Sequence, residues 1–262
     1  MDQSVSPAAF DIMNKTAPGP ALVICDHASN AVPNWAAGGD LGLSAADMAR
    51  HIAWDPGAAE VSRILSDTLG APAVFSAFSR LVIDPNRGPD DPTLLMKLYD
   101  GSIIPGNRYA DAAELARRKA LGYDPYHAAI GGQIDRMLAA GVTPHLISIH
   151  SFTPQLRGKP RRPWDVGILW DRDARLSGPL IAALRAEGDL TVGDNEPYTG
   201  QLEGDCMYRH GTQRGLPHVL IEVRNDLVAD TAGQSAWGER LGRILGPLVP
   251  IVEEQVAQRA AP

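Results

Sequence analysis

The chain is poor in cysteine and has no long apolar run. It holds only two cysteines, Cys25 and Cys206, among 262 residues, too few for a disulfide framework or a four-thiolate zinc site. No stretch of about 18 apolar residues exists that would span a membrane. The N-terminus has neither the cationic nor the apolar segment of a signal peptide. These absences predict a cytoplasmic protein with reduced thiols and no membrane partner.

Positive charge is also in deficit, because the formal net charge is -7 at pH 7. This balance argues against a nucleic-acid partner, although a local basic pocket for an anionic substrate remains compatible with it. Hydrophobic residues make up 44% of the chain, enough to bury a substantial core. Since no internal repeat or low-complexity linker divides the chain, we expect a single domain over residues 1–262, with about 1–17 as a loosely ordered arm.

Short apolar segments alternate with amphipathic ones along the chain. Ala21 to Cys25 is a continuous apolar run, typical of a strand buried on both faces. Asp55 and Pro56 are expected to open a helix, with Asp55 as its N-cap, and Gly70 to end it. Further strands are expected at 73–75, 81–83, 145–149, 166–170, 190–192 and 218–223, and further helices at 109–140 with a break near 122–125, at 173–187 and at 237–256. The alternation predicts an α/β fold with a mixed, largely parallel sheet flanked by helices on both faces.

Chemically active residues stand at the carboxyl ends of three predicted strands: His27, His150 and Glu222. Ligands of open α/β sheets collect at this edge. Two histidines and a carboxylate can hold a catalytic zinc and supply a general base. The alternative for each histidine alone is a structural polar residue, and for Glu222 an ion pair with Arg80 or Arg224.

The segment from Ser79 to Arg87 carries a second signal. Arg80 and Arg87 bracket an apolar stretch, and Arg87 closes the turn Asp84-Pro85-Asn86-Arg87. An arginine fork binds a carboxylate through two hydrogen bonds, and asparagine adds a neutral donor. A network that merely pins a loop explains the same residues equally well.

Several short motifs share their order and spacing with a known family. They are Asp26-His27-Ala28-Ser29, Trp54-Asp55-Pro56-Gly57-Ala58, Ser79 to Arg87, Pro125-Tyr126-His127, Ile149-His150-Ser151-Phe152, Asn195-Glu196-Pro197-Tyr198, His210-Gly211 and Ile221-Glu222-Val223-Arg224. From about Ala21 to Trp237 the chain resembles the N-formylglutamate amidohydrolase family, in its shorter, less characterised branch. The resemblance implies a zinc-carboxypeptidase-like fold, also similar to aspartoacylases. It further implies hydrolysis of N-formyl-L-glutamate to glutamate and formate, a step of histidine degradation.

The resemblance also implies a metal centre with one Zn²⁺ per chain. His27 and His150 would be ligands of the metal, and Glu222 the general base. Zinc carboxypeptidases place a glutamate three residues after the first ligand histidine, where this chain has Asn30. Because an amide oxygen carries no formal charge, Asp55 is the preferred third ligand, with the helix N-cap as its alternative role.

Substrate binding is assigned in the same way, for a small anionic acyl amino acid. Asn86 and Arg87 would hold the carboxylate, and Arg80 would polarise the acyl oxygen. His210 is a candidate substrate contact or, equally, a structural turn residue. The protein is expected to be a monomer or a small homo-oligomer.

Two other functions remain open at this point. One is a metal-dependent amidase or peptidase that acts on another acyl amino acid or on a peptide. The other is a non-catalytic homologue that binds anions without a working metal centre. A serine or cysteine hydrolase, with Ser151 beside His150 or Cys25 beside His27, is disfavoured because these neighbours are not placed to act together and no Gly-x-Ser-x-Gly motif is present. The segment 90–107, rich in Pro, Gly and Asp, fits either a lid over the pocket or an ordinary surface loop.

Overall fold

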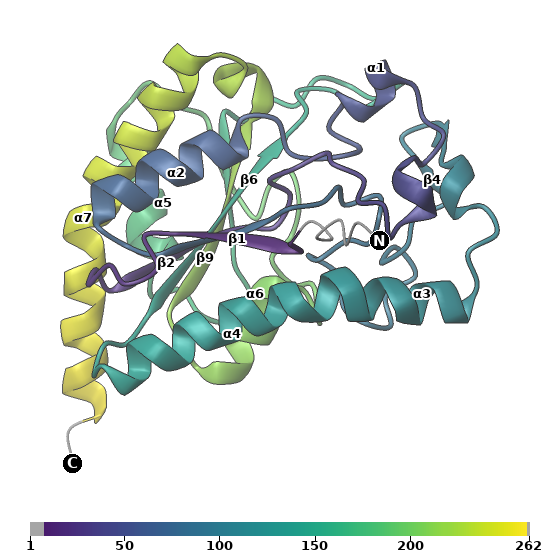
Figure 1. Cartoon of the computed structure of the whole chain (residues 1–262). Helices are drawn as coiled ribbons and strands as arrows, with labels where there is room; N and C mark the ends of the chain where they lie inside the picture. The colour runs from purple at the N-terminus through teal and green to yellow at the C-terminus, as the bar shows by residue number, and fades with distance from the viewer. Residues whose placement is uncertain (1–7, 261–262) are drawn as a thin grey trace.

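The computed structural model describes residues 8–260, with only the backbone described for residues 251 and 253–260. Within this range a seven-stranded sheet has the order β1-β3-β2-β6-β9-β7-β8 (Figure 1). The strands are β1 (Phe10–Met13), β2 (Ala21–Cys25), β3 (Ala73–Ser76), β6 (His145–Phe152), β7 (Val166–Leu169), β8 (Val192–Asp194) and β9 (His218–Arg224). Strands β3, β2, β6 and β9 are parallel. β1 runs antiparallel to β3, and β7 runs antiparallel to β9 but parallel to β8. The predicted mixed, largely parallel sheet is confirmed.

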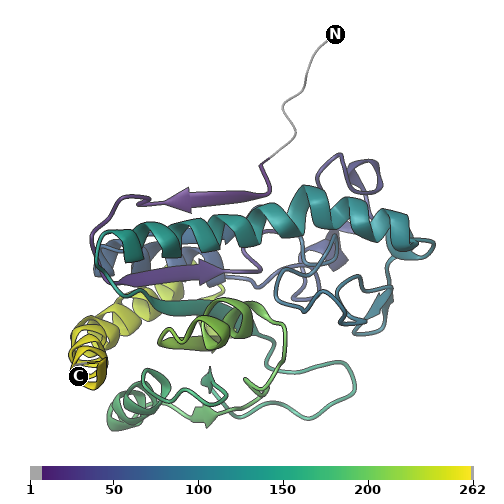
Figure 2. The ribbon, with the colours of Figure 1, turned by 90° about the horizontal axis from the view of Figure 1, so that it is seen from below.

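Helices cover both faces of this sheet, as the two views in Figures 1 and 2 show. One face packs against α2 (Ala58–Leu69), α5 (Ser177–Ala186) and α7 (Thr231–Ala260). The other packs against α4 (Asp124–Ala139) and the short α6 (Cys206–His210). Two further short helices are α1 (Ala45–Met48) and α3 (Ala112–Arg118). In the described part of the chain, none of the helices is both long and apolar enough to span a membrane.

Strand β2 shows why both faces are apolar. All five of its residues are buried. Ala21, Val23 and Cys25 pack into the core under α2 and α7, whereas Leu22 and Ile24 pack under α4. The same alternation places the even-numbered residues of β6 and β9, His150 and Glu222 among them, on the α4 face.

Two predictions for the segments on either side of α2 are wrong. Leu81 to Ile83 form a buried turn rather than a strand, because they pack into an apolar cluster beside the sheet and do not pair with it. Asp55 is not the N-cap of α2. That position is taken by Gly57, at φ 82°, which frees the Asp55 carboxylate for other contacts. The predicted end of α2 at Gly70 is confirmed, with φ 55°.

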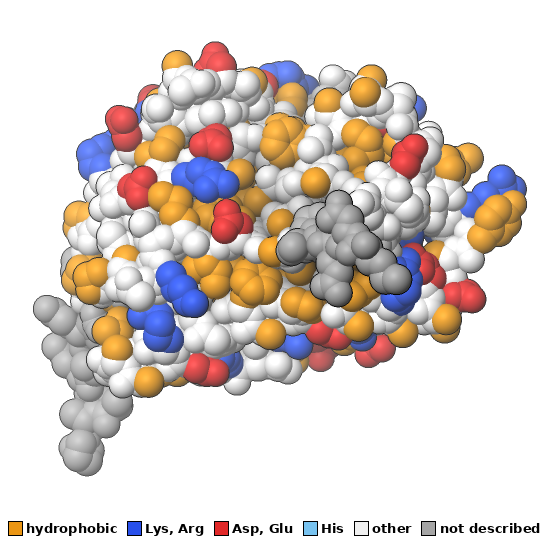
Figure 3. Space-filling view, viewed as in Figure 1, with side chains coloured by type: hydrophobic (Ala, Val, Ile, Leu, Met, Phe, Trp, Pro, Cys, Tyr) orange, Lys and Arg blue, Asp and Glu red, His pale blue; other side chains and the backbone are white. Residues whose placement is uncertain are grey.

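The expected break near residues 122–125 is a π-helical turn, Lys119–Tyr123, that joins α3 to α4 without interruption. Of the predicted N-terminal arm, residues 1–7 lie outside the described residues, and Phe10–Met13 forms the edge strand β1. Segment 90–107 contains the two-stranded hairpin β4 (Leu98–Tyr99) and β5 (Ser102–Ile103). On the face shown in Figure 3, basic and acidic side chains are interspersed and no broad basic patch is visible.

Candidate active site

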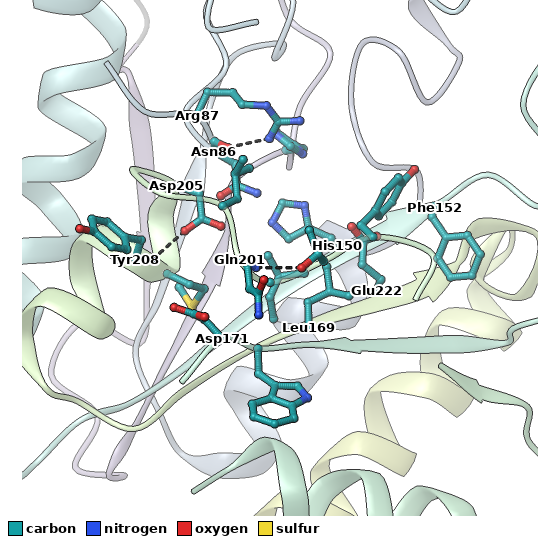
Figure 4. Close-up of a pocket in the computed structure, with 18 of the residues that line it drawn as sticks. Asn86, Arg87, His150, Phe152, Leu169, Asp171, Gln201, Asp205, Tyr208 and Glu222 are labelled. Atoms are coloured by element: carbon teal, nitrogen blue, oxygen red, sulfur yellow. Dashed lines mark hydrogen bonds between the residues drawn. The ribbon is translucent and has the colours of Figure 1, made fainter. Parts of the chain in front are cut away.

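A cavity of about 840 Å³ opens at the carboxyl ends of β2, β6 and β9. Figure 4 shows part of its lining, with Asn86 and Arg87 at one side of His150 and Leu169 at another. The predicted site residues that line the cavity are His27, Asp55, Arg80, Asn86, Arg87, His150 and Glu222. Residues from five separate segments of the sequence therefore meet in one place.

Two histidines and a carboxylate converge in this cavity. The candidate ligand atoms of His27, Asp55 and His150 all lie within 4.8 Å of one another. Asp55 Oδ2 is 3.3 Å from His27 Nδ1 and 2.8 Å from His150 Nδ1. Asn30 does not join them, because its side-chain amide donates to the Met48 carbonyl at 2.9 Å. Two imidazole nitrogens and one carboxylate oxygen are a donor set that suits zinc.

Each of these histidines is held from behind by a further buried carboxylate. His27 Nε2 is 2.7 Å from Asp84 Oδ1, and His150 Nε2 is 3.0 Å from Asp26 Oδ2. Asp26 is itself fixed by a 2.9 Å hydrogen bond from the Tyr126 hydroxyl. These bonds orient both rings with Nδ1 toward Asp55, as outer carboxylates do for histidine ligands in metal sites.

The charges of the cluster reinforce this arrangement. Burial alone would raise the pKa of Asp26 and of Asp55, but the hydrogen bonds and charges of His150 and His27 hold both well below the usual range. Burial likewise disfavours a charged His150, yet Asp26 and Asp55 raise its pKa well above the ordinary value. The carboxylates thus stay ionised at neutral pH, which favours a bound cation.

Glu222 lies on β9, directly opposite His150 on the neighbouring strand. Its Oε2 atom is buried and has no hydrogen-bond partner among the described residues. Burial raises its pKa to about 7. Because an unpaired buried carboxylate is costly, such a group indicates a site that is completed by a ligand or a metal-bound water. A pKa near neutrality suits a general base.

Arg80 brings the positive charge nearest to the histidines. Its Nε and Nη2 donate to Asp84 Oδ2 at 3.0 and 2.7 Å, and Nη1 lies 3.6 Å from Asp55 Oδ1. The residue is only 7% exposed. These two hydrogen bonds to one carboxylate oxygen fix the guanidinium beside the cluster and at the cavity wall.

Asn86 and Arg87 keep donors available for an anion. The Asn86 Oδ1 accepts from the Cys206 backbone N–H at 3.1 Å, which assigns the amide orientation and leaves Nδ2 without an acceptor in the described structure. Arg87 donates through Nη1 to the Asn86 carbonyl at 2.7 Å and through Nε to Thr93 at 3.0 Å. Its Nη2 donates to no residue between 8 and 260. Two free donors at the cavity wall fit a carboxylate.

His210 is placed differently from its prediction. It does not line the cavity, and its Nε2 is 2.9 Å from Nδ1 of His127, with the two rings stacked. These two histidines form a second cluster with Cys206. Burial lowers the pKa of His127 to about 3 and that of His210 to about 4, so both rings are neutral. The predicted direct substrate contact has no support from this position.

Sequence reasoning missed Asp205, which lines the cavity beside Asn86 (Figure 4). Its Oδ1 accepts from the Tyr208 backbone N–H at 2.7 Å and so caps α6. Burial raises the pKa of Asp205 to about 7. Aspartate is a preferred N-cap residue, and its place directly before the helical segment Cys206–His210 is the sequence signal that could have found Asp205.

Residues 19–229 match the family model of N-formylglutamate amidohydrolase. A crystal structure of a gene product from Agrobacterium tumefaciens is 38% identical, with a TM-score of 0.87, 94% of this chain covered and 96% of that one. The N-formylglutamate amidohydrolase of Ralstonia eutropha shares the fold at 22% identity and a TM-score of 0.65, with 95% and 99% covered. A search of curated proteins gave no match. The match over most of its length shows that the chain belongs to the N-formylglutamate amidohydrolase family.

Proposed function

We propose that this protein is a metal-dependent amidohydrolase that cleaves the N-acyl bond of a small acidic amino acid, with N-formyl-L-glutamate as its reference substrate. Membership of the family supports amidohydrolase activity in general. One observation carries the metal dependence: Nδ1 of His27 and Nδ1 of His150 meet Asp55 Oδ2, while a second carboxylate orients each ring.

This donor set would hold one Zn²⁺ per chain. Three protein ligands leave a coordination position open, as in catalytic rather than structural zinc sites. A zinc ion bound there supplies a water of lowered pKa and polarises the acyl carbonyl.

The chain's own residues supply the remaining chemistry. Glu222 takes a proton from the attacking water and later gives it to the leaving amine, for which its raised pKa is suited. Arg80, fixed by Asp84, stabilises the negative charge that develops on the acyl oxygen. Because Asp84 also holds His27, one carboxylate positions both groups relative to each other.

Asn86 and Arg87 hold the substrate carboxylate and so set the position of the scissile bond. Their free donors, Asn86 Nδ2 and Arg87 Nη2, lie at the same wall of the cavity. A carboxylate fixed at one end of the substrate orients the amide for attack and lowers the entropic part of the barrier.

The test is release of formate from N-formyl-L-glutamate, measured before chelation, after chelation and after zinc is added back. The proposal expects turnover that is lost on chelation and restored by zinc. Undiminished turnover in the metal-free protein would contradict metal dependence. No turnover of any N-acyl amino acid with zinc present would instead favour a non-catalytic anion-binding protein.

A further inference from the structure

The cavity is larger than the reference substrate requires. N-formylglutamate has about twelve non-hydrogen atoms, and even at the roughly 30 Å³ that a water takes in the liquid, each atom counted so gives only about 360 Å³. The cavity measures about 840 Å³. More than half of the cavity volume therefore remains when the volume of a bound N-formylglutamate has been subtracted.

Part of the cavity runs along strand β9. Glu222, Leu220 and His218 all line the cavity, and they lie on one face of that strand because they alternate along it. Four residues of strand correspond to roughly 13 Å. The cavity thus extends about that far from the general base toward the beginning of β9.

The side of this extension formed by β7, β9 and α6 is apolar. Leu169 lies opposite Leu220 in the register of β7 and β9, and Met207 of α6 belongs to the same apolar cluster and also lines the cavity. Asp171 and Asp205 line the cavity as well, and Figure 4 shows Asp171 next to Leu169. Arg172 also lines the cavity and pairs with Asp171 at 3.4 Å, and the apolar part of the extension is the one formed by β7, β9 and α6.

The far end is closed by groups whose hydrogen bonds are already made. His218 Nδ1 is 2.8 Å from the Leu216 carbonyl, and His218 Nε2 is 3.2 Å from Thr212 Oγ1. Neither ring nitrogen is left to bind a polar ligand. An uncharged, apolar group fits this end better than a charged or strongly hydrogen-bonding one.

We propose that the preferred substrate carries, besides its carboxylate and scissile amide, an uncharged and largely apolar chain or ring that lies along β9 from Glu222 toward His218. This inference rests on the proposed function and names its substrate class more closely. The chain or ring belongs either to an acyl group larger than formyl or to the side chain of the amino acid, which in the second case replaces the acidic side chain of the reference substrate. The chemistry that the extension recognises is the same in both cases.

Two substrate series distinguish these sources. The first keeps L-glutamate and lengthens the acyl group from formyl through butanoyl to hexanoyl. The second keeps the formyl group and replaces glutamate by L-norleucine and L-phenylalanine. We expect kcat/KM to rise at least about tenfold along one series, because buried apolar area is gained only where the group enters the extension. The series that rises identifies the source.

Substitutions inside and outside the extension localise the effect. Leu220→Phe should lower the ratio of kcat/KM for the best elongated compound to that for N-formyl-L-glutamate by about tenfold, because the added ring fills the space. Leu169→Phe, on the opposite strand, should do the same and serves if the first variant is poorly folded. Leu138→Phe, on an exposed part of α4, is the matched control and should leave the ratio at the wild-type value.

A fall of kcat/KM along both series, with a ratio that Leu220→Phe does not change, would overturn the inference while leaving the proposed function intact. If none of the compounds is turned over with zinc present, the proposed function fails instead. Calorimetric binding of the same compounds to Glu222→Gln then tests the extension without turnover. Tighter binding of elongated compounds supports it, and equal or weaker binding overturns it.

Discussion

The described part of the chain contains two buried clusters of similar composition and different surroundings. The cavity cluster consists of His27, Asp55 and His150, and the second cluster of His127, Cys206 and His210. In each, three possible ligand atoms lie within 4.8 Å, and every residue is at most 5% exposed. Residue type and burial therefore do not distinguish them.

Charge and access do distinguish them. Asp26 and Asp84 back the histidines of the cavity cluster, whereas the rings of His127 and His210 bond to each other. The pKa of His150 is raised, and the pKa values of His127 and His210 are lowered to about 3 and 4. Only the first cluster contributes to the lining of the cavity described above. The comparison teaches that two candidate metal clusters with the same burial can differ in the carboxylates behind their histidines and in access to a cavity.

The largest difference should appear when one histidine is removed from each cluster. His150→Ala takes away a ligand atom and removes the imidazole that bonds to both Asp26 and Asp55. We expect bound zinc to fall from about one per chain to near zero, and formate release to fall below detection. In His210→Ala both should stay within a few-fold of wild type. Elemental analysis and formate release measure this, with thermal denaturation as the check on folding.

The opposite pattern, loss of metal and turnover in His210→Ala with both retained in His150→Ala, would assign the metal to the second cluster.

Glu222→Gln tests the general base without touching the three ligands. The variant keeps the shape of the side chain but cannot take a proton, so kcat should fall by about 10²–10⁴-fold. Zinc content and melting temperature should remain those of wild type. A wild-type kcat would remove Glu222 from this role and leave its unpaired Oε2 unexplained.

Arg87→Ala should act on binding more than on the chemical step. The Arg87 guanidinium lies beside Asn86, where the substrate carboxylate is proposed to bind, and makes no bond to the histidines of the cavity cluster. KM should therefore rise about 10- to 100-fold while kcat changes little. Arg108→Ala, which removes an arginine outside the cavity lining, is the control and should leave KM at the wild-type value. A fall in kcat with constant KM would place Arg87 in the transition state instead.

The smallest effect concerns stability at Asp205. Its pKa rises from 3.8 to about 7 on folding. Relative to neutral pH, the protonated Asp205 therefore contributes stability that is fully present below about pH 4 and is lost as the pH rises through about 7. In metal-free protein, Asp205→Asn, which retains an N-cap, should therefore be more stable than wild type at pH 8, by an amount on the order of a few kcal/mol. At pH 4 the two should be alike. Urea unfolding at both pH values measures this. An equal difference in unfolding free energy between variant and wild type at pH 4 and pH 8 would refute the raised pKa of Asp205.

Much of the fold was predictable because apolar runs and helix ends are local signals. The buried run Ala21–Cys25 and the terminating Gly70 each reflect a preference of a few neighbouring residues. Leu81 to Ile83 has the composition of a strand yet forms a turn, because its burial comes from packing beside the sheet and not from pairing. Periodicity cannot separate these two causes of burial.

The site also has a part that local patterns predict and a part that they do not. Placement at strand ends sufficed to bring His27, His150 and Glu222 together, since parallel strands end at one edge. The supporting contacts of Asp26 and Asp84 depend on the direction of each side chain across long sequence separations, which no local pattern encodes. For the same reason the sequence left open whether His210 contacts substrate or has a structural role; its ring turns toward His127 and away from the cavity lining.

The most direct test of the central claim is anomalous X-ray scattering at the zinc edge from crystals of the zinc-loaded protein. The account predicts a peak about 2.0–2.2 Å from Nδ1 of His27, Nδ1 of His150 and a carboxylate oxygen of Asp55. A peak among His127, Cys206 and His210 instead, or no peak at the cavity cluster, would contradict it.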